Sequence, residues 1–210
     1  MLQLLNVLVL LCFSFMLQAF TPPPPKRSDL FVGAQLGLTL NHIATLKNTN
    51  KTYLDPNYGL RVGYEGYFGS YGGMRIYTNI SYENIHLDFD DTQLNASMLH
   101  YALGADYLFE FLNPINPSGI FIGMGYEWNS SELSKKLIED VKNQYITQNS
   151  HGIFMNVGIS QIFLRSSKVE LGFKVPFYTY IKMERISKMK NFKINIRSYG
   201  NFYVAYSYIF

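Results

Sequence analysis

Eight segments of this chain alternate between apolar and polar residues, and this alternation constrains the fold more than any other feature. A β-strand presents successive side chains to opposite faces, so a period of two separates one face from the other. The segments cover residues 30–40, 58–68, 74–83, 97–109, 120–128, 152–163, 169–181 and 192–210. The pattern predicts an all-β protein built from eight antiparallel strands.

The charged residues of these segments fall on the glycine-rich face, and the opposite face is apolar and aromatic. A lipid-facing Arg or Lys at the bilayer midplane costs about 2–4 kcal/mol, so lipid excludes charge from the face that it contacts. A soluble barrel would show the reverse arrangement, with its charges turned outwards into water. Backbone groups in lipid find no water, so the sheet must close. The sidedness therefore predicts a transmembrane β-barrel.

We expect the inward-facing charged residues to form a polar network in the lumen. Its predicted members are Arg61, Glu65, Arg75, Glu83, His100, Asp106, Glu127, Glu170, Lys174 and Arg197. An eight-stranded barrel is just wide enough inside to be filled by side chains. We therefore expect ion pairs that plug the lumen, and a small conducting pore is the alternative.

The connections between the segments predict the orientation of the barrel. Residues 69–72, 110–118 and 164–168 are short connections, which face the periplasm in barrels of this kind. Residues 41–57, 84–96, 129–151 and 182–191 are mostly longer and are expected outside. The third of these outer loops has apolar residues at helical spacing within 131–145, which predicts a short amphipathic helix over the barrel rim.

The last outer hairpin is basic. It carries Lys182, Arg185, Lys188, Lys190 and Lys193 against the single acid Glu184. Outside an outer membrane the neighbouring anions are the phosphates of lipopolysaccharide, so we expect this hairpin to contact lipopolysaccharide. A net charge of only +3 gives no indication of nucleic-acid binding.

The first nineteen residues predict a cleaved signal peptide. Residues 2–19 are largely apolar and end in Gln18-Ala19, although no Lys or Arg follows Met1. A retained membrane anchor is the alternative. Residues 20–28 contain four consecutive prolines and are expected to form a periplasmic linker. The barrel is then expected over residues 29–210.

No catalytic, cofactor or metal site is predicted. The chain has four His, and the closest cluster is Glu83, His86, Asp88, Asp90 and Asp91, which we interpret as a solvated acidic loop. No His-x-Ser pair of the lipid A deacylase type is present, and no Ser is evidently placed as a nucleophile. We therefore expect no enzyme, with a lipid A-modifying barrel as the less favoured alternative.

Residues 202–210 resemble the C-terminal assembly signal of bacterial outer-membrane barrels. The pattern is carried by Tyr203, Ala205, Tyr208 and Phe210, with Ala205 where Gly is more usual. This resemblance implies recognition by the barrel assembly machinery. The residues Val175-Pro176-Phe177-Tyr178 and Arg197-Ser198-Tyr199 further resemble the last strands of Helicobacter outer-membrane proteins. That resemblance implies the fold and a location in the bacterial outer membrane, and it does not extend to the adhesin or porin activities of large family members.

The sequence thus predicts an integral outer-membrane barrel with a structural or surface-interaction role. Its outer loops are the expected contact surface for a host or surface ligand, and membrane lipid and lipopolysaccharide are the expected surroundings.

Overall fold

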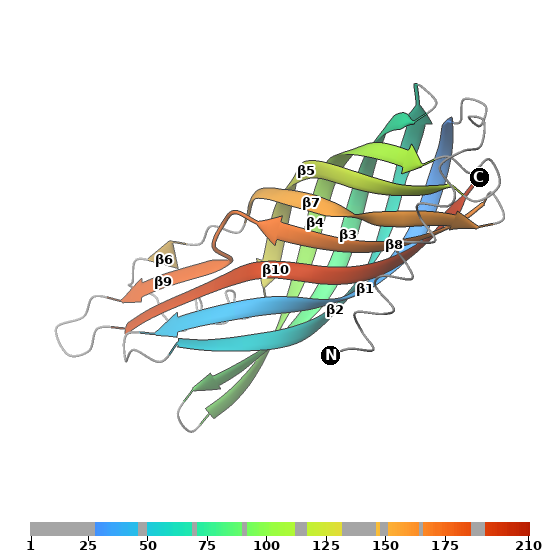
Figure 1. Cartoon of the computed structure of the whole chain (residues 1–210). Helices are drawn as coiled ribbons and strands as arrows, with labels where there is room; N and C mark the ends of the chain where they lie inside the picture. Colours follow the sequence, from blue (N-terminus) through green and yellow to red (C-terminus); the bar gives the residue numbers. More distant parts are fainter. Residues whose placement is uncertain are drawn as a thin grey trace, which may run out of the picture.

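Strands of the computed structural model close into a tilted antiparallel barrel (Figure 1). The structure describes residues 28–45, 50–68, 71–89, 92–111, 117–131, 146–147, 151–163, 166–185 and 192–210. Its strands are β1 (Ser28–Thr45), β2 (Asn50–Tyr67), β3 (Gly72–Phe89), β4 (Thr92–Phe111), β5 (Ser118–Ser131), β6 (Ile146–Thr147), β7 (His151–Phe163), β8 (Ser167–Pro176), β9 (Ile181–Arg185) and β10 (Phe192–Ile209).

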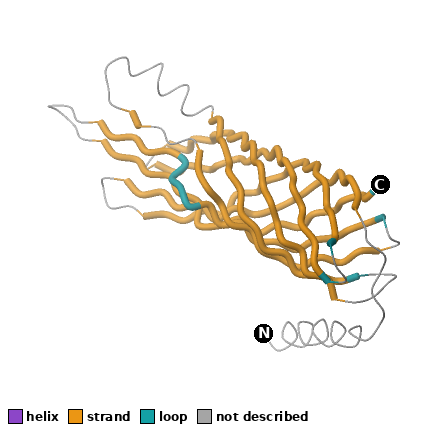
Figure 2. The backbone as a smooth tube through the Cα atoms, turned by 90° about the horizontal axis from the view of Figure 1, so that it is seen from above, coloured by secondary structure: helices purple, strands orange, loops and turns teal. Residues whose placement is uncertain are grey.

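Eight of these strands surround the lumen in the order β1-β2-β3-β4-β5-β7-β8-β10, and pairing between β10 and β1 closes the ring. The predicted eight-stranded antiparallel barrel is therefore confirmed. Closure reaches the last residue, because the Phe210 backbone N–H donates to the Leu30 carbonyl at 3.0 Å. The short strands β9 and β6 extend the sheet at the opposite end of the barrel (Figures 1 and 2).

The predicted strand 169–181 is interrupted in the structure. β8 ends at Pro176 and β9 starts at Ile181, so residues 177–180 lie outside regular pairing. β10 pairs with β8 through residues 201–208 and with β9 through residues 192–196. Burial still alternates through this interruption, and the buried rings of Tyr178 and Tyr180 lie 5.3 Å apart between centroids.

The two faces of the barrel differ as the alternation predicts. Apolar side chains such as Leu36 (69% exposed) point outwards, into what is lipid in a membrane, while the charged side chains lie inside. Aromatic pairs gather outside near the short turns, for example Phe68 with Tyr107 and Tyr71 with Phe109. Aromatic residues favour this level because their rings suit the membrane–water interface.

Two of the predicted outer loops are mostly strand, which corrects the prediction. Residues 41–57 and 84–96 form the outer ends of the β1–β2 and β3–β4 hairpins, with pairing as far as Ala44↔Asn50 and Phe89↔Thr92. Beyond the bilayer both faces of a strand meet polar surroundings. The outward apolar face that marks a lipid-facing strand is therefore no longer required, while backbone pairing continues.

The outer hairpins separate between β2 and β3. These strands pair only from Tyr67 to Asn57, and the next residue, Pro56, has no backbone N–H to donate. Beyond this level β3 and β4 continue as a hairpin that diverges from β2 (Figure 1).

No described helix has the length and apolar character needed to cross a membrane. The predicted signal peptide (1–19) and most of the linker (20–28) lie outside the described residues, as does nearly all of the predicted loop helix (131–145). These three expectations stay predictions.

Candidate functional site: the polar network of the lumen

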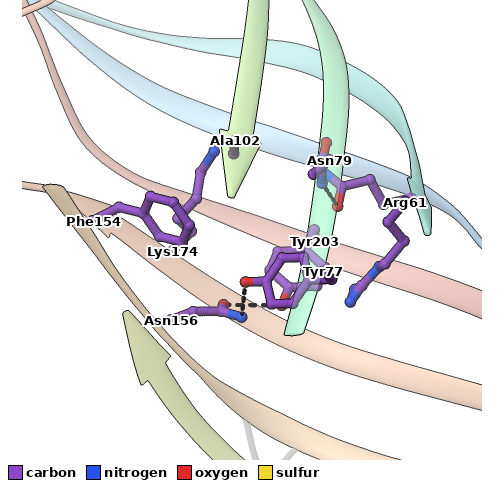
Figure 3. A pocket seen from close by; sticks show the side chains of 9 residues that line it. Arg61, Tyr77, Asn79, Ala102, Phe154, Asn156, Lys174 and Tyr203 are labelled. Carbon is purple, nitrogen blue, oxygen red and sulfur yellow. Dashed lines mark hydrogen bonds between the residues drawn. The ribbon is translucent and has the colours of Figure 1, made fainter. Parts of the chain in front are cut away.

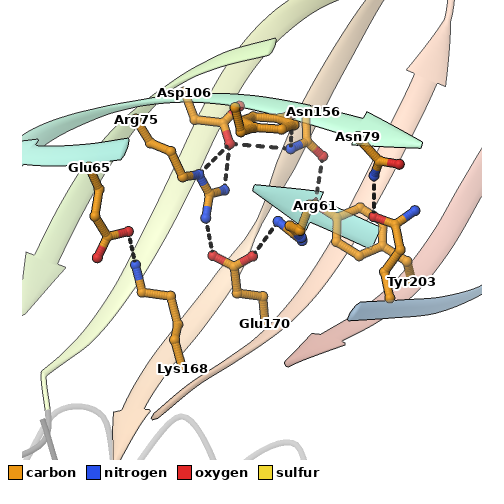
Figure 4. Close-up of polar contacts among 11 residues, drawn as sticks. Arg61, Glu65, Arg75, Asn79, Asp106, Asn156, Lys168, Glu170 and Tyr203 are labelled. Atoms are coloured by element: carbon orange, nitrogen blue, oxygen red, sulfur yellow. Dashed lines mark hydrogen bonds and ion pairs between the residues drawn. The ribbon is translucent and has the colours of Figure 1, made fainter. Parts of the chain in front are cut away.

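Four charged side chains meet in the middle of the lumen (Figure 4). Glu170 on β8 accepts hydrogen bonds from two arginines: its Oε2 lies 2.7 Å from Arg61 Nη1 on β2, and its Oε1 pairs with Arg75 Nη1 on β3. Arg75 also donates from Nη2 to Asp106 Oδ2 on β4 at 2.5 Å. Two cations and two carboxylates thus alternate in one chain of ion pairs, which we call the central quartet.

The central quartet crosses the full width of the barrel. β3 and β8 are four places apart in a ring of eight strands, so the Arg75–Glu170 pair joins opposite walls. Asn156 on β7 extends the network, because it donates to Asp106 Oδ2 at 3.4 Å and accepts from the Tyr203 hydroxyl at 2.9 Å. The side chains of these residues have almost no solvent exposure.

Aromatic rings enclose the two arginines. The Arg75 guanidinium lies 5.0 Å from the ring centroid of Phe121 and 5.3 Å from that of Tyr77, and Arg61 lies 5.3 Å from that of Tyr203. These distances allow cation–π attraction, which strengthens when the cation is desolvated. Large inward rings fit because each faces a glycine on a neighbouring strand; the pairs are Tyr77 with Gly104, Phe121 with Gly158, Phe154 with Gly125 and Tyr203 with Gly172.

A second group of polar residues lies towards the end of the barrel with the short turns. Lys168 on β8 pairs with Glu65 on β2, and both side chains are buried. The Tyr67 hydroxyl donates to Glu110 Oε1 at 2.5 Å. Each carboxylate here therefore has a donor from a different strand.

A third group lies towards the outer end. Glu127 on β5 accepts from Lys174 Nζ at 2.5 Å and from the Tyr178 hydroxyl at 2.6 Å. His100 stands between two carboxylates, with Nε2 3.2 Å from Glu83 and Nδ1 3.5 Å from Glu127. Glu83 also accepts from Asn41, whose amide donates to Asp55 at 2.8 Å. The buried polar groups thus continue as far as the outer hairpins.

The structure brings together nine of the ten predicted lumen residues. Eight are buried, and the ninth, Lys174, has a side chain only 12% exposed. Arg197 is the exception, because it is exposed on the outer face of β10. Between Leu40 and Asn41 the β1–β10 register shifts, from Leu40↔Gly200 to Asn41↔Ser198. Tyr199 is the extra residue, and it reverses the sidedness of β10 beyond it, so the prediction for Arg197 was wrong.

Among the described residues, three buried charged side chains are not members of the predicted network: Lys168, Glu110 and Asp55. Lys168 and Glu110 were assigned to turns, and Asp55 was assigned to an outer loop. A signal was present for Lys168, which stands two residues before Glu170 and so shares its face in a strand. Asp55 also carried a signal, because Leu54, Pro56 and Tyr58 alternate with Asp55 and Asn57, but a proline argues against a paired strand.

A small cavity remains beside the central quartet (Figure 3). It measures about 20 Å³ and is lined mainly by amide, aromatic and cationic side chains, among them Asn79, Tyr203 and Lys174. This is room for one or two water molecules. Within the described residues, no group of three or more His, Cys, Asp or Glu side chains is arranged to hold a metal ion.

The predicted assembly-signal residues alternate across the wall of the barrel. Tyr203 and Ala205 are buried in the lumen, and Tyr208 and Phe210 are exposed outside. Of the predicted lipopolysaccharide-contact residues, Lys182 and Arg185 are backbone positions in β9 and Lys193 is one in β10. Lys188 and Lys190 lie outside the described residues.

Comparisons with known proteins agree with this architecture. A family model described as Helicobacter outer membrane protein matches residues 59–210. No curated protein matches the sequence significantly. Among solved structures, the outer membrane protein OprG from Pseudomonas aeruginosa is 10% identical, with a TM-score of 0.56 over 89% of this chain and 98% of that chain.

Two further solved barrels are similar at lower scores. Ail of Yersinia pestis is 10% identical, with a TM-score of 0.44 over 87% of this chain and 99% of that chain. Neisserial surface protein A is 11% identical, with a TM-score of 0.45 over 88% of this chain and 99% of that chain. The likeness to OprG concerns the fold alone.

Proposed function

Because this chain belongs to the Helicobacter outer membrane protein family, we propose that it is an outer-membrane barrel that is plugged by its own side chains and acts through its outer surface. Its location in the outer membrane follows from the family. The plugged lumen and the structural or surface-interaction role are the steps that we add.

The observation that carries the plugged lumen is the Arg75–Glu170 pair. It joins opposite walls of the barrel, and Arg61 and Asp106 extend it to two further strands. Breaking a buried ion pair leaves a charge uncompensated in a low-dielectric interior and costs about 3–5 kcal/mol. Thermal motion therefore opens this crossing rarely, and ions find no continuous aqueous path through it.

Conductance across planar lipid bilayers tests this proposal. We expect the wild-type barrel to insert without steady conductance. The double variant Arg75→Ala/Glu170→Ala removes both side chains of the crossing pair. We expect this variant to conduct. Steady conductance by the wild-type protein would overturn the plugged lumen and favour the small pore.

We also propose that the protein is not an enzyme. Among the described contacts, no imidazole joins a carboxylate at one nitrogen to a hydroxyl at the other: His100 has carboxylates at both nitrogens, and His151 Nδ1 lies 2.5 Å from the Tyr126 hydroxyl. His42 Nδ1 is 3.3 Å from Thr52 Oγ1, and among the described side chains no carboxylate orients this imidazole. An unchanged lipid A mass spectrum after deletion of the gene supports the proposal, and a changed one favours a lipid A-modifying enzyme.

The outer surface is the proposed place of interaction. The β1–β2 and β3–β4 hairpins extend beyond the lipid-facing wall and offer their outer ends to a host or surface ligand. The basic hairpin that includes Lys182, Arg185 and Lys193 is proposed to contact lipopolysaccharide. Charge reversal of these three residues should reduce co-purification of lipopolysaccharide, and unchanged co-purification would contradict the contact.

The C-terminal strand is the proposed recognition element for the barrel assembly machinery. Its alternation ends in exposed Tyr208 and Phe210, whose rings lie 5.2 Å apart between centroids. Replacing Phe210 by Ser should lower the amount of folded barrel in the outer membrane, as measured by heat-modifiable migration on gels. Full assembly of this variant would contradict the role.

A further inference from the structure

The outer edge of the apolar wall is visible on three adjacent strands. On β1 and β2 the pair Leu40↔Leu54 is exposed and apolar. The next outward-facing pair is His42↔Thr52, which is polar. On the other side of β1, His42 is paired with Arg197. Arg197, His42 and Thr52 therefore form a polar row directly above an apolar row, where hydrocarbon gives way to lipid headgroups.

The register shift in β10 creates this row. If β10 alternated strictly from Phe202, with every residue paired, Arg197 would point into the lumen. With the register shift, Arg197 and Tyr199 both point outwards and are exposed. The Tyr199 ring lies 5.1 Å from the His42 ring between centroids. An aromatic ring beside a cation at this height is typical of a membrane interface.

Arg197 differs from the lumen arginines in its surroundings, as far as the structure describes them. Arg61 and Arg75 both pair with Glu170, and Arg75 also pairs with Asp106. Among the side chains that the structure describes, no carboxylate forms an ion pair with Arg197. Its exposed guanidinium is a planar fork of donors, which matches the geometry of a phosphate and can bind it through two parallel hydrogen bonds.

We propose that Arg197, with His42 and Tyr199 beside it, binds the phosphate of a lipid A headgroup in the outer leaflet. The long hairpins place this end of the barrel outside, where lipid A phosphates lie at the level of the row. This inference rests on the proposed lipopolysaccharide contact for the class of partner. The inference adds a specific phosphate site on the outer wall of the barrel, at the register shift in β10.

Binding of lipid A to the full-length barrel in detergent tests the site, with dissociation constants measured by native mass spectrometry. We expect phosphorylated lipid A to bind the wild-type protein more tightly than dephosphorylated lipid A. Arg197→Gln should weaken binding of phosphorylated lipid A about tenfold, the loss expected for a charge-assisted hydrogen bond. The affinity of Arg197→Lys should lie between those of wild type and Arg197→Gln, because lysine keeps the charge and lacks the planar fork of donors.

Lys51→Gln is the matched control. Lys51 is exposed and precedes Thr52, so it stands at nearly the same height on the opposite face of the hairpin, and its loss removes the same charge. We expect this variant to bind within about twofold of wild type, since exposed charges are screened over a Debye length. Equal weakening by both variants would overturn the site in favour of general surface charge, and so would wild-type affinity in Arg197→Gln.

Failure of this test is distinct from failure of the proposed function. Conductance tests the plugged lumen, and that measurement does not depend on Arg197. Loss of lipopolysaccharide co-purification on reversal of the basic hairpin, together with wild-type affinity in Arg197→Gln, would retain the general contact and reject this site.

Discussion

Arg75 and Arg197 belong to the same barrel and meet opposite surroundings. Arg75 is 1% exposed, pairs with two carboxylates and is enclosed by aromatic rings. Arg197 is exposed on the outer wall beside His42 and Tyr199, and no described carboxylate pairs with it. The contrast teaches that this barrel neutralises an arginine in its lumen with carboxylates from other strands, whereas an arginine on its outer wall faces the surroundings of the barrel.

The largest effect should come from removing the internal arginine. Arg75→Leu leaves Glu170 with one partner fewer and takes both of the arginine's hydrogen bonds from Asp106. We expect a loss of about 3–5 kcal/mol in the free energy of unfolding. Urea unfolding in lipid vesicles, followed by the fluorescence of the single tryptophan, Trp128, measures it. A loss below about 1 kcal/mol would mean that the central quartet does not stabilise the barrel.

A charge placed on the lipid-facing wall should lower the free energy of unfolding slightly less than Arg75→Leu does. Leu36 lies in the middle of the outward apolar run of β1, so Leu36→Arg should destabilise the barrel by about 2–4 kcal/mol. The same vesicle unfolding experiment measures the difference. Leu36→Phe is the control, because it keeps the position apolar and should change little. If Leu36→Arg is as stable as its control, this face does not meet hydrocarbon.

Packing inside the lumen should be sensitive to added volume. A Cβ on Gly172 would collide with the Tyr203 ring, so we expect Gly172→Val to cost about 1–3 kcal/mol through overpacking. Gly66→Val is the control, since a Cβ there meets no atom closer than 3.5 Å. Similar unfolding free energies for the two variants would show that the lumen has room to spare around Tyr203.

The smallest effect should come from the outer arginine. Charged residues near the interface cost or contribute only about 0–1 kcal/mol in barrels, so Arg197→Leu should leave the free energy of unfolding within about 1 kcal/mol of wild type in phosphatidylcholine vesicles. A larger loss would place Arg197 in a stabilising contact within the protein and would remove the contrast with Arg75.

Much of the lumen network could be predicted from the sequence because strand sidedness is a local property. Arg61, Asp106 and Glu170 each stand directly between two apolar or aromatic residues, so their face follows from their own segments. Their pairing could not be predicted in the same way. Arg61 and Glu170 are 109 residues apart and meet only because the closed ring places β2 and β8 across the lumen.

The failures also have a local physical cause. A strand beyond the lipid no longer needs an outward apolar face. Residues 84–89 therefore still alternate, but their polar members continue the side that is apolar in the spanning part, and Pro56 argues against pairing next to Asp55. One extra residue in a strand reverses every side chain after it. Arg197 was therefore assigned to the lumen by an alternation that the strand itself does not keep.

The amino-acid sequence by itself determined that this chain has two chemically distinct strand faces, and hence a barrel with charge inside and hydrocarbon outside. That information lies in the order of neighbouring residues. Only the tertiary structure decided which charges neutralise one another, where β10 reverses its faces and which arginine is exposed on the outer wall. These facts depend on the register between strands that are distant in the chain, and register is set by the closure of the whole ring.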